Sequence, residues 1–454
     1  MVDLLLADGH IVGPVETHER GAASIDGRGA VVLPGLHDHH LHILATAARR
    51  TSIDLAGLAG ADAIATRLRH AAAGVAPGTW LRAVGYDERA SGLPDRWCLD
   101  AWVPDHPLRL QDRTGALWVL NSAALQVLAT TDWPPGCERD ASGQPNGRFW
   151  REDRWLAAWR PAMMPDIAAL GRELASRGVT ALTDAGAGNG PTEAAVLAHG
   201  HLSGALPQRL TLMGAENLPE GRGYVRGALK LLLDERDPPS LESLAERIRG
   251  ARASGRAVAA HCVTEVELAL YLAALAMAGG ARPGDRIEHG GMIVPEAIDE
   301  IAGAGLAIVS NPVFLHGRGD RYAETLTPAE QADLYRIASL LRAGVRLAAG
   351  SDAPYGDPDP WLSMRSARDR LSAGGRMLSP DERVSAATAM RLHWSNRLDA
   401  GAGTPLTPGA AADLILCEGS IRDVLADLSA DRVCATIIGG RVVFSRDGAA
   451  LPRQ

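Results

Sequence analysis

The stretch VVLPGLHDHHLH (31–42) decides the fold, because an apolar run with strand character ends there in a cluster of histidines. Side chains at positions i and i+2 of a strand point to the same face, so His40 and His42 can reach one metal ion together. His37 and His39 point to the opposite face and are poor ligand candidates. Imidazoles at the carboxyl end of a buried strand lie where a (β/α)8 barrel places its chemistry.

Four later segments share this form, with a polar residue near the C-terminal end of an apolar run. They are GALKLLLDE (227–235), AVAAHCVTE (257–265), DRIEHGG (285–291) and LAAGSDAP (347–354), and their polar residues are Lys230, His261, His289 and Asp352. The first three follow one another at intervals of about 30 residues, which is the length of one strand-plus-helix unit of such a barrel. If His42 ends strand 1 and Asp352 ends strand 8, the other three fall on strands 4, 5 and 6. The segment between His42 and Lys230 is too long for three plain units, which indicates an insertion.

The order of these residues resembles the amidohydrolase superfamily, with HxH on strand 1, Lys on strand 4, His on strands 5 and 6, and Asp on strand 8. Further segments are similar to its family-3 branch, which includes N-substituted formamide deformylases: LDAWVPDHPLRL (99–110), NSAAL (121–125), GVTALTDAG (178–186) and PGAAADLIL…VCATIIGGRVV (408–443). The resemblance covers nearly the whole chain. It implies an α/β fold, namely a (β/α)8 TIM-type barrel with a small composite β-sandwich domain from both termini and an inserted capping subdomain.

The expected parts have the following bounds. Residues 1–30 and 405–454 form the β-sandwich domain, residues 31–404 form the barrel, and the inserted subdomain covers about 55–160 and caps the active-site mouth, as in the resembling branch. Two independent terminal hairpins are the alternative to a β-sandwich. Apolar periodicity predicts helices over ALGRELASRG (169–178), SLESLAERIRGARASG (240–255) and EVELALYLAALAMAGG (265–280).

The role of Lys230 follows from the resemblance. A free ammonium repels metal ions, whereas a neutral amine can react with CO2 to form a carbamate with two oxygens, which can bridge two divalent ions. The resemblance implies this carbamate for a lysine on strand 4. An ordinary lysine that pairs with Asp234 or Glu235 is the alternative, although burial of an unmodified lysine in this apolar segment is costly.

The other five residues complete the implied metal centre. His40 and His42 hold one divalent ion, and His261 and His289 hold a second with the carbamate. Imidazole and carboxylate ligands without thiolate suit Zn2+, with Mn2+, Fe2+ or Ni2+ as alternatives. A metal-bound hydroxide is the expected nucleophile, because metal binding lowers the pKa of water to about 7. Asp352 would take its proton and pass it to the leaving nitrogen, and it would also touch the first ion.

Three functions remain open at this point. The first is a metal-dependent amidohydrolase that cleaves a C–N bond of a small amide or cyclic amide, with a related ester or phosphotriester as a further substrate class. The second is a mononuclear deaminase of an aminated heterocycle, a class that usually lacks the bridging lysine, so Lys230 argues against it. The third is a metal-binding barrel without catalysis, which the presence of all six polar residues disfavours.

Substrate contacts are expected from the loops around the barrel mouth. The candidates are Tyr86, Arg113, Trp118 and Asn121 in the inserted segment, and His316, Arg318, Arg321, Tyr322 and Tyr355 near strands 7 and 8. Arginine near such a site suggests an anionic or carbonyl-rich substrate. The resembling branch often has a Gly-His step where this chain has Gly115-Ala116. A role carried by that histidine is therefore absent or moved.

The resemblance implies a small-molecule substrate as the partner, and composition argues against other partner classes. A net charge of −8 and a pI of about 6.0, without a basic block, argue against nucleic acid. The sequence contains no apolar run of about 18 residues, so we expect no membrane span. The N-terminus does not resemble a signal peptide. The five cysteines form no CxxC pair, which favours a reduced, cytoplasmic location. The resemblance implies a homodimer.

Overall fold

The structure is a computed structural model that describes residues 3–15, 26–27, 29–128, 130, 132–157, 165–235, 237–394 and 406–446. Parts of the predicted ranges 1–30 and 405–454 lie outside the described residues. The chain divides into two compact units. We call Met1–Ile43 with Ile167–Gln454 the barrel unit, and Leu44–Asp166 the inserted unit.

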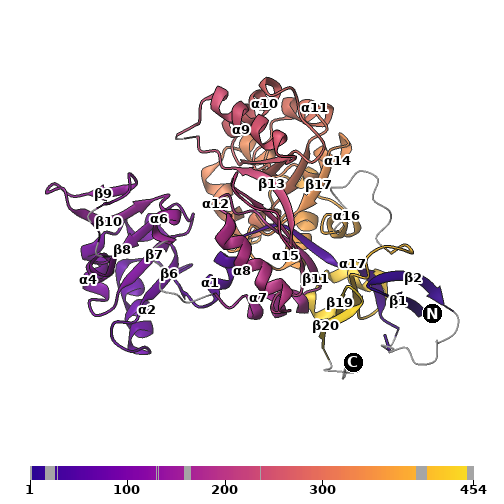
Figure 1. The fold of residues 1–454 in the computed structure, drawn as a ribbon, viewed down its shortest axis with the longest axis horizontal. Coiled ribbons are helices and arrows are strands. Elements are labelled where there is room, and N and C mark those ends of the chain that lie inside the picture. The colour runs from indigo at the N-terminus through magenta and orange to yellow at the C-terminus, as the bar shows by residue number, and fades with distance from the viewer. Residues whose placement is uncertain are drawn as a thin grey trace. The chain divides into compact units, whose positions relative to one another are not determined.

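The barrel unit is built on eight parallel strands, which confirms the predicted fold class (Figure 1). In spatial order they are β4 (Leu36–Leu41), β11 (Val179–Asp184), β12 (Arg209–Gly214), β13 (Val225–Leu231), β14 (Val258–Cys262), β15 (Arg286–His289), β16 (Ala307–Ser310) and β17 (Arg346–Ala349). Among these eight strands, each one neighbours the next one along the chain. Lys230, His261 and His289 therefore lie on the fourth, fifth and sixth strands.

The first and last strands meet just beyond their carboxyl ends. The backbone N–H of Asp352 donates to the carbonyl of His40 at 2.7 Å, and the N–H of His42 donates to the carbonyl of Ala353 at 2.8 Å. Gly350 permits this approach, because a Cβ there would lie 2.5 Å from the backbone nitrogen of His40. The same backbone contacts thus close the barrel and bring Asp352 to the histidine pair.

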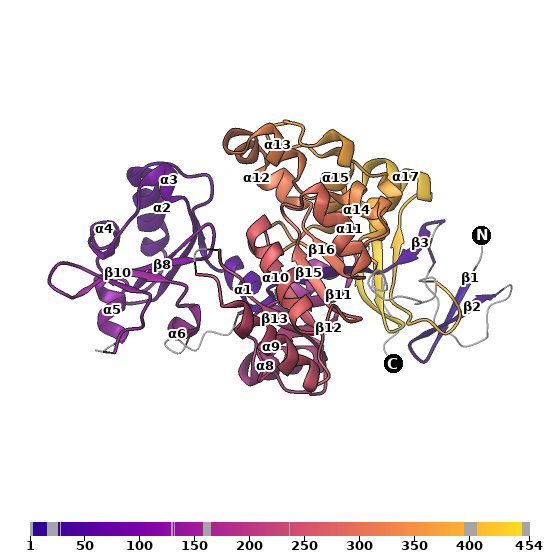
Figure 2. The same cartoon turned by 90° about the horizontal axis from the view of Figure 1, so that it is seen from above.

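Helices cover the outside of these strands (Figure 2). They are α7 (Ile167–Ser176), α8 (Pro191–Leu202), α9 (Leu241–Ala253), α10 (Glu265–Met277), α11 (Pro295–Gly303), α12 (Val313–Thr325), α13 (Pro328–Ala332), α14 (Ile337–Arg342), α15 (Pro360–Asp369) and α16 (Ala386–Arg391). The periodic segments predicted to be helical form α7, α9 and α10. Thr264 begins α10 with a capping box, in which its hydroxyl accepts from the N–H of Glu267 and the Glu267 carboxylate accepts from the N–H of Thr264.

The two ends of the chain meet in small antiparallel sheets beside the barrel (Figure 1). β1 (Asp3–Ala7) pairs with β2 (His10–Val15), while β3 (Val31–Pro34) joins β18 (Leu414–Cys417), β19 (Val433–Ile438) and β20 (Arg441–Ser445), with α17 (Ile421–Asp427) between β18 and β19. Ile11 packs in one apolar cluster with Leu414, Leu416 and Ile437. The predicted alternative of two independent terminal hairpins is therefore wrong.

The inserted unit has a core of its own. Its elements are α1 (Ile43–Arg50), β5 (Ile53–Asp54), α2 (Ala61–Ala73), β6 (Leu81–Tyr86), α3 (Glu88–Ser91), α4 (Arg96–Trp102), β7 (Leu108–Asp112), β8 (Leu117–Leu120), α5 (Ser122–Leu128), β9 (Cys137–Arg139), β10 (Pro145–Trp150) and α6 (Asp153–Ala157). Its six strands form one mixed sheet in the order β5-β6-β7-β8-β10-β9.

Every helix in the described part of the chain is too short or too polar to span a lipid bilayer.

Candidate metal centre

Three of the predicted ligands lie together at the carboxyl end of the barrel. Nε2 of His40 lies 3.3 Å from Oδ1 of Asp352, and Nε2 of His42 lies 3.2 Å from the same oxygen. These three side chains form a cluster that could hold a metal ion. Ligand atoms about 2.0–2.2 Å from one Zn2+ ion lie roughly this far from one another. The spacing therefore fits a single ion between them.

His261 and His289 form a second group. Their ring centroids are 4.5 Å apart, and the ring of His289 is 4.6 Å from that of His40. Strand register pairs His289 with Cys262, whose side chain packs in the outer hydrophobic core. The ring of His289 does not lie on that outer face, because its φ of +71° is a left-handed conformation that ends the strand alternation and turns the ring inward. Burial lowers the pKa of His289 well below its ordinary value, which favours the neutral imidazole that binds metals.

Lys230 is buried on β13, with 4% of its surface exposed. Its Nζ has no hydrogen-bond partner among the described residues. Burial lowers the pKa of this amine, while the nearby carboxylates of Glu288 and Asp352 partly oppose that shift. Lys230 is also the only lysine in a chain with 46 lysine and arginine residues. A buried amine without a partner, within electrostatic reach of the other ligands, fits a lysine that is modified when metal is bound.

Glu288 belongs to the centre, although no motif singled it out. It is fully buried on β15, where one carboxylate oxygen contacts Nδ1 of His40 and the other accepts from Nε of Arg286 at 2.5 Å. Burial raises the pKa of Glu288, but Arg286, Lys230 and His40 outweigh burial and hold the pKa well below its usual range. The ionised carboxylate therefore places the proton of His40 on Nδ1 and leaves Nε2 to face Asp352.

Two further side chains, those of Asn311 and Asp38, fix the ligands, and sequence reasoning missed the first of them. Nδ1 of His289 lies 2.8 Å from Oδ1 of Asn311, whose amide donates to the carbonyl of Gly350 at 2.9 Å. Asp38 accepts from the backbone N–H of Ser351 at 2.9 Å and from that of His40 at 3.2 Å. Burial raises the pKa of Asp38 to about 6, against the hydrogen bonds from Ser351. Both residues tie the ligand positions to the barrel closure.

We expect Glu288→Gln to weaken Zn2+ binding by about 10- to 100-fold, the usual effect of losing such a ligand-orienting carboxylate. A chelator competition titration would measure the dissociation constant. Asp285→Asn is a matched control, because Asp285 is also fully buried and pairs with Arg252 at 2.9 Å. Equal Zn2+ affinity in the two variants would show that Glu288 supports the fold and leaves the metal site unaffected.

The four substrate candidates in the inserted unit have partners within that unit. Tyr86 donates to the carbonyl of Gly92 at 2.8 Å, Arg113 pairs with Asp87 at 3.3 Å, Trp118 donates to Asp153 at 2.7 Å, and the amide of Asn121 bonds to four backbone groups. Each side chain stabilises the unit through these contacts. Their contact with a substrate stays a prediction.

Among the candidates of the barrel unit, Tyr355 contacts one of the predicted metal ligands. The ring of Tyr355 lies edge-on to that of His42, with centroids 5.8 Å apart, and Arg318 donates to the carbonyl of Tyr355 at 3.3 Å. Tyr322 packs in the same apolar cluster as Tyr355. His316 accepts a backbone hydrogen bond from Ala373 at 3.0 Å. The substrate contacts of these residues, like that of Arg321, stay predictions.

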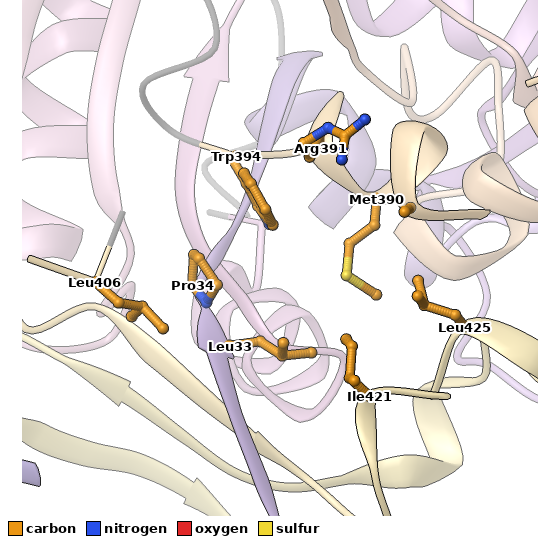
Figure 3. Close-up of a pocket in the computed structure, with 9 residues that line it drawn as sticks. Leu33, Pro34, Met390, Arg391, Trp394, Leu406, Ile421 and Leu425 are labelled. Atoms are coloured by element: carbon orange, nitrogen blue, oxygen red, sulfur yellow. The ribbon is translucent and has the colours of Figure 1, made fainter. Parts of the chain in front are cut away.

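A cavity of about 420 Å³ lies elsewhere in the barrel unit (Figure 3). Residues of β3, α16 and α17 contribute most of its lining: Leu33, Pro34, Ala387, Met390, Arg391, Trp394, Leu406, Ile421 and Leu425. None of the six predicted ligands is among them. We therefore place the chemistry at the histidine cluster and not in this apolar cavity.

Known proteins are similar to this chain in sequence and in fold. Residues 23–444 match the model of the amidohydrolase family. The chain is 26% identical to N-substituted formamide deformylase of Arthrobacter pascens, over 97% of this chain and 94% of that protein. An uncharacterized metal-dependent hydrolase of Pyrococcus horikoshii OT3 shares the fold, with a TM-score of 0.74 and 20% identity over 92% of this chain and 93% of that one. Because the family match spans the barrel and every predicted ligand, the chain belongs to the amidohydrolase family.

Proposed function

We propose that the protein hydrolyses the C–N bond of a small amide with two divalent metal ions. Lys230 carries this proposal. It is the only lysine of the chain, and its amine is buried without a hydrogen-bond partner among the described residues. All the other lysine-or-arginine positions of the chain are arginine. Arginine cannot form a carbamate, because its guanidinium stays protonated. A bridging carbamate explains why this one position keeps an amine.

The remaining residues supply the other ligands. His40 and His42 with Asp352 would hold one ion, His261 and His289 the second, and the carbamate on Lys230 both. Ions bound there would polarise the substrate carbonyl and lower the pKa of a water molecule. A carboxylate oxygen of Asp352 would accept the proton of the attacking water and deliver it to the leaving nitrogen. Glu288 keeps His40 in the required tautomer throughout.

The substrate class is supported by the relative that deformylates N-substituted formamides, which is similar over nearly the whole chain. N-substituted formamides are therefore the first compounds to assay, followed by cyclic amides. The resembling branch often has Gly-His where this chain has Gly115-Ala116, so a substrate contact carried by that histidine is absent or moved here. We therefore expect the substituent on the amide nitrogen to differ from that of the relative's substrate.

The decisive experiment measures metal content and hydrolysis on one preparation. We expect about two divalent ions per chain by plasma mass spectrometry after purification without chelator and with bicarbonate, together with release of formate and amine. About one ion per chain, with ammonia released from aminated heterocycles, would instead indicate a mononuclear deaminase. Protein without bound metal or hydrolysis would contradict both enzyme functions.

A further inference from the structure

Helix α12 carries an aromatic and basic stripe that begins at the metal centre. Phe314, Arg318 and Tyr322 are spaced four residues apart and therefore lie along one face of the helix. The helix starts two residues after Asn311, which holds His289. Phe314, Tyr322 and Tyr355 pack in one apolar cluster together with the buried Tyr335. The stripe therefore forms part of an aromatic wall at the ligand end of the barrel.

Arg318 is the charged member of this wall. Its guanidinium carbon lies 3.6 Å from the centroid of the Phe314 ring, and its Nη2 donates to the carbonyl of Tyr355 at 3.3 Å. Tyr355 in turn contacts two metal-site residues: its ring lies against that of His42, and its N–H donates to the carbonyl of Asp352 at 2.8 Å. Arg318 therefore contacts Tyr355, which in turn contacts the ligand cluster.

The charge of Arg318 is not neutralised within the described part of the chain. The structure gives it the Phe314 ring and the Tyr355 carbonyl as partners and no carboxylate. Its side chain is half-buried. Several half-buried arginines of the barrel unit do have carboxylate partners, such as Arg177 with Glu173 at 3.0 Å. An uncompensated guanidinium beside a catalytic centre is available for an anionic group from outside the chain.

The surroundings of the guanidinium indicate which anion fits. The guanidinium carbon of Arg318 lies over the Phe314 ring and Nη2 donates to the Tyr355 carbonyl, so the N–H groups outside that bond can bind an acceptor. These N–H groups match the two oxygens of a carboxylate in a bidentate arrangement. The aromatic residues around it favour an apolar or aryl group between that carboxylate and the scissile bond.

We propose that Arg318 binds a carboxylate carried by the substrate, so that the protein prefers anionic amides over neutral ones. This inference rests on the proposed amide hydrolysis and adds the charge of the substrate to it. Arg318 would bind the part of the substrate that does not react. Its contribution should therefore depend on whether the carboxylate is present.

The test uses pairs of N-formyl amines with alkyl or benzyl spacers, in which one member ends in a carboxylate and the other in the corresponding carboxamide. We expect the wild-type protein to show a kcat/KM ratio of about 10- to 100-fold in favour of the carboxylate, the range for a charge-assisted hydrogen bond. Arg318→Met should bring the ratio close to one. Arg342→Met is the charge-matched control, because Arg342 is exposed on α14 and bonds to Ser339, and it should keep the wild-type ratio.

Other outcomes would overturn the inference. A wild-type ratio near one would do so, and so would an equal loss on both members in Arg318→Met, which is the result expected if Arg318 only holds Tyr355 in place. If neither member is hydrolysed, the proposed function fails, and calorimetric binding of the same pairs decides the inference separately. Tighter binding of the carboxylate member that is lost in Arg318→Met would support it, and equal binding would refute it.

Discussion

Replacing Lys230 with alanine is expected to reduce the metal content from about two ions per chain to one or none and to bring hydrolysis down to background. The variant lacks the only side-chain amine that can form a carbamate, so the two ligand groups lose the residue that would join them. Plasma mass spectrometry and the formamide assay would measure the two effects, and circular dichroism would confirm that the variant is folded. Full metal content and activity in Lys230→Ala would show that the carbamate bridge is wrong.

Lys230→Arg is the informative partner to this variant. It retains the positive charge that the rest of the chain carries on arginine, yet it cannot react with CO2. We therefore expect it to lose metal as Lys230→Ala does. A short carboxylate such as acetate or propionate should partly restore metal and activity in the alanine variant, where a cavity replaces the amine, and not in the arginine variant.

Asp352→Asn is expected to lower kcat by about 10²- to 10⁴-fold, the usual contribution of a general acid–base group, while the metal remains bound. Asparagine tolerates the left-handed conformation of this position, where φ is +53°, so the barrel closure should persist. Metal content, kcat and thermal melting should be measured on one preparation.

The control for this variant is Asp359→Asn. Asp359 caps α15 by accepting from the N–H of Trp361 at 3.0 Å, and asparagine caps helices about as well as aspartate. We expect little change in kcat for the control. If Asp352→Asn and Asp359→Asn both kept nearly full activity, Asp352 would have no part in proton transfer.

Much of the barrel could be predicted because its chemistry recurs at a fixed interval along the chain. Lys230, His261 and His289 lie on the strands that their spacing indicated, and Asp352 follows the last strand. The inserted unit has no comparable repeat, and its mixed sheet combines parallel and antiparallel pairs, which local patterns do not determine. Pairing partners within that unit could therefore be learned only from the structure.

The supporting residues of the centre could not be predicted for a different reason. Strand alternation would place Glu288 and His289 on opposite faces of β15. Glu288 faces the interior, and His289 does so as well because its left-handed backbone conformation breaks the alternation. Asn311 and Gly350 act through contacts between segments that are distant in sequence. The singularity of Lys230, in contrast, could have been found by counting residues.

That singularity makes the chain unusual toward acylating reagents. Succinimidyl esters acylate lysine amines, and here they meet one such side chain, which is 4% exposed, besides the α-amine of the chain. Acylation of the folded protein should therefore leave its side-chain amine unmodified. In an intact-mass spectrum, a second acyl group would report that the amine at the barrel centre had become uncovered.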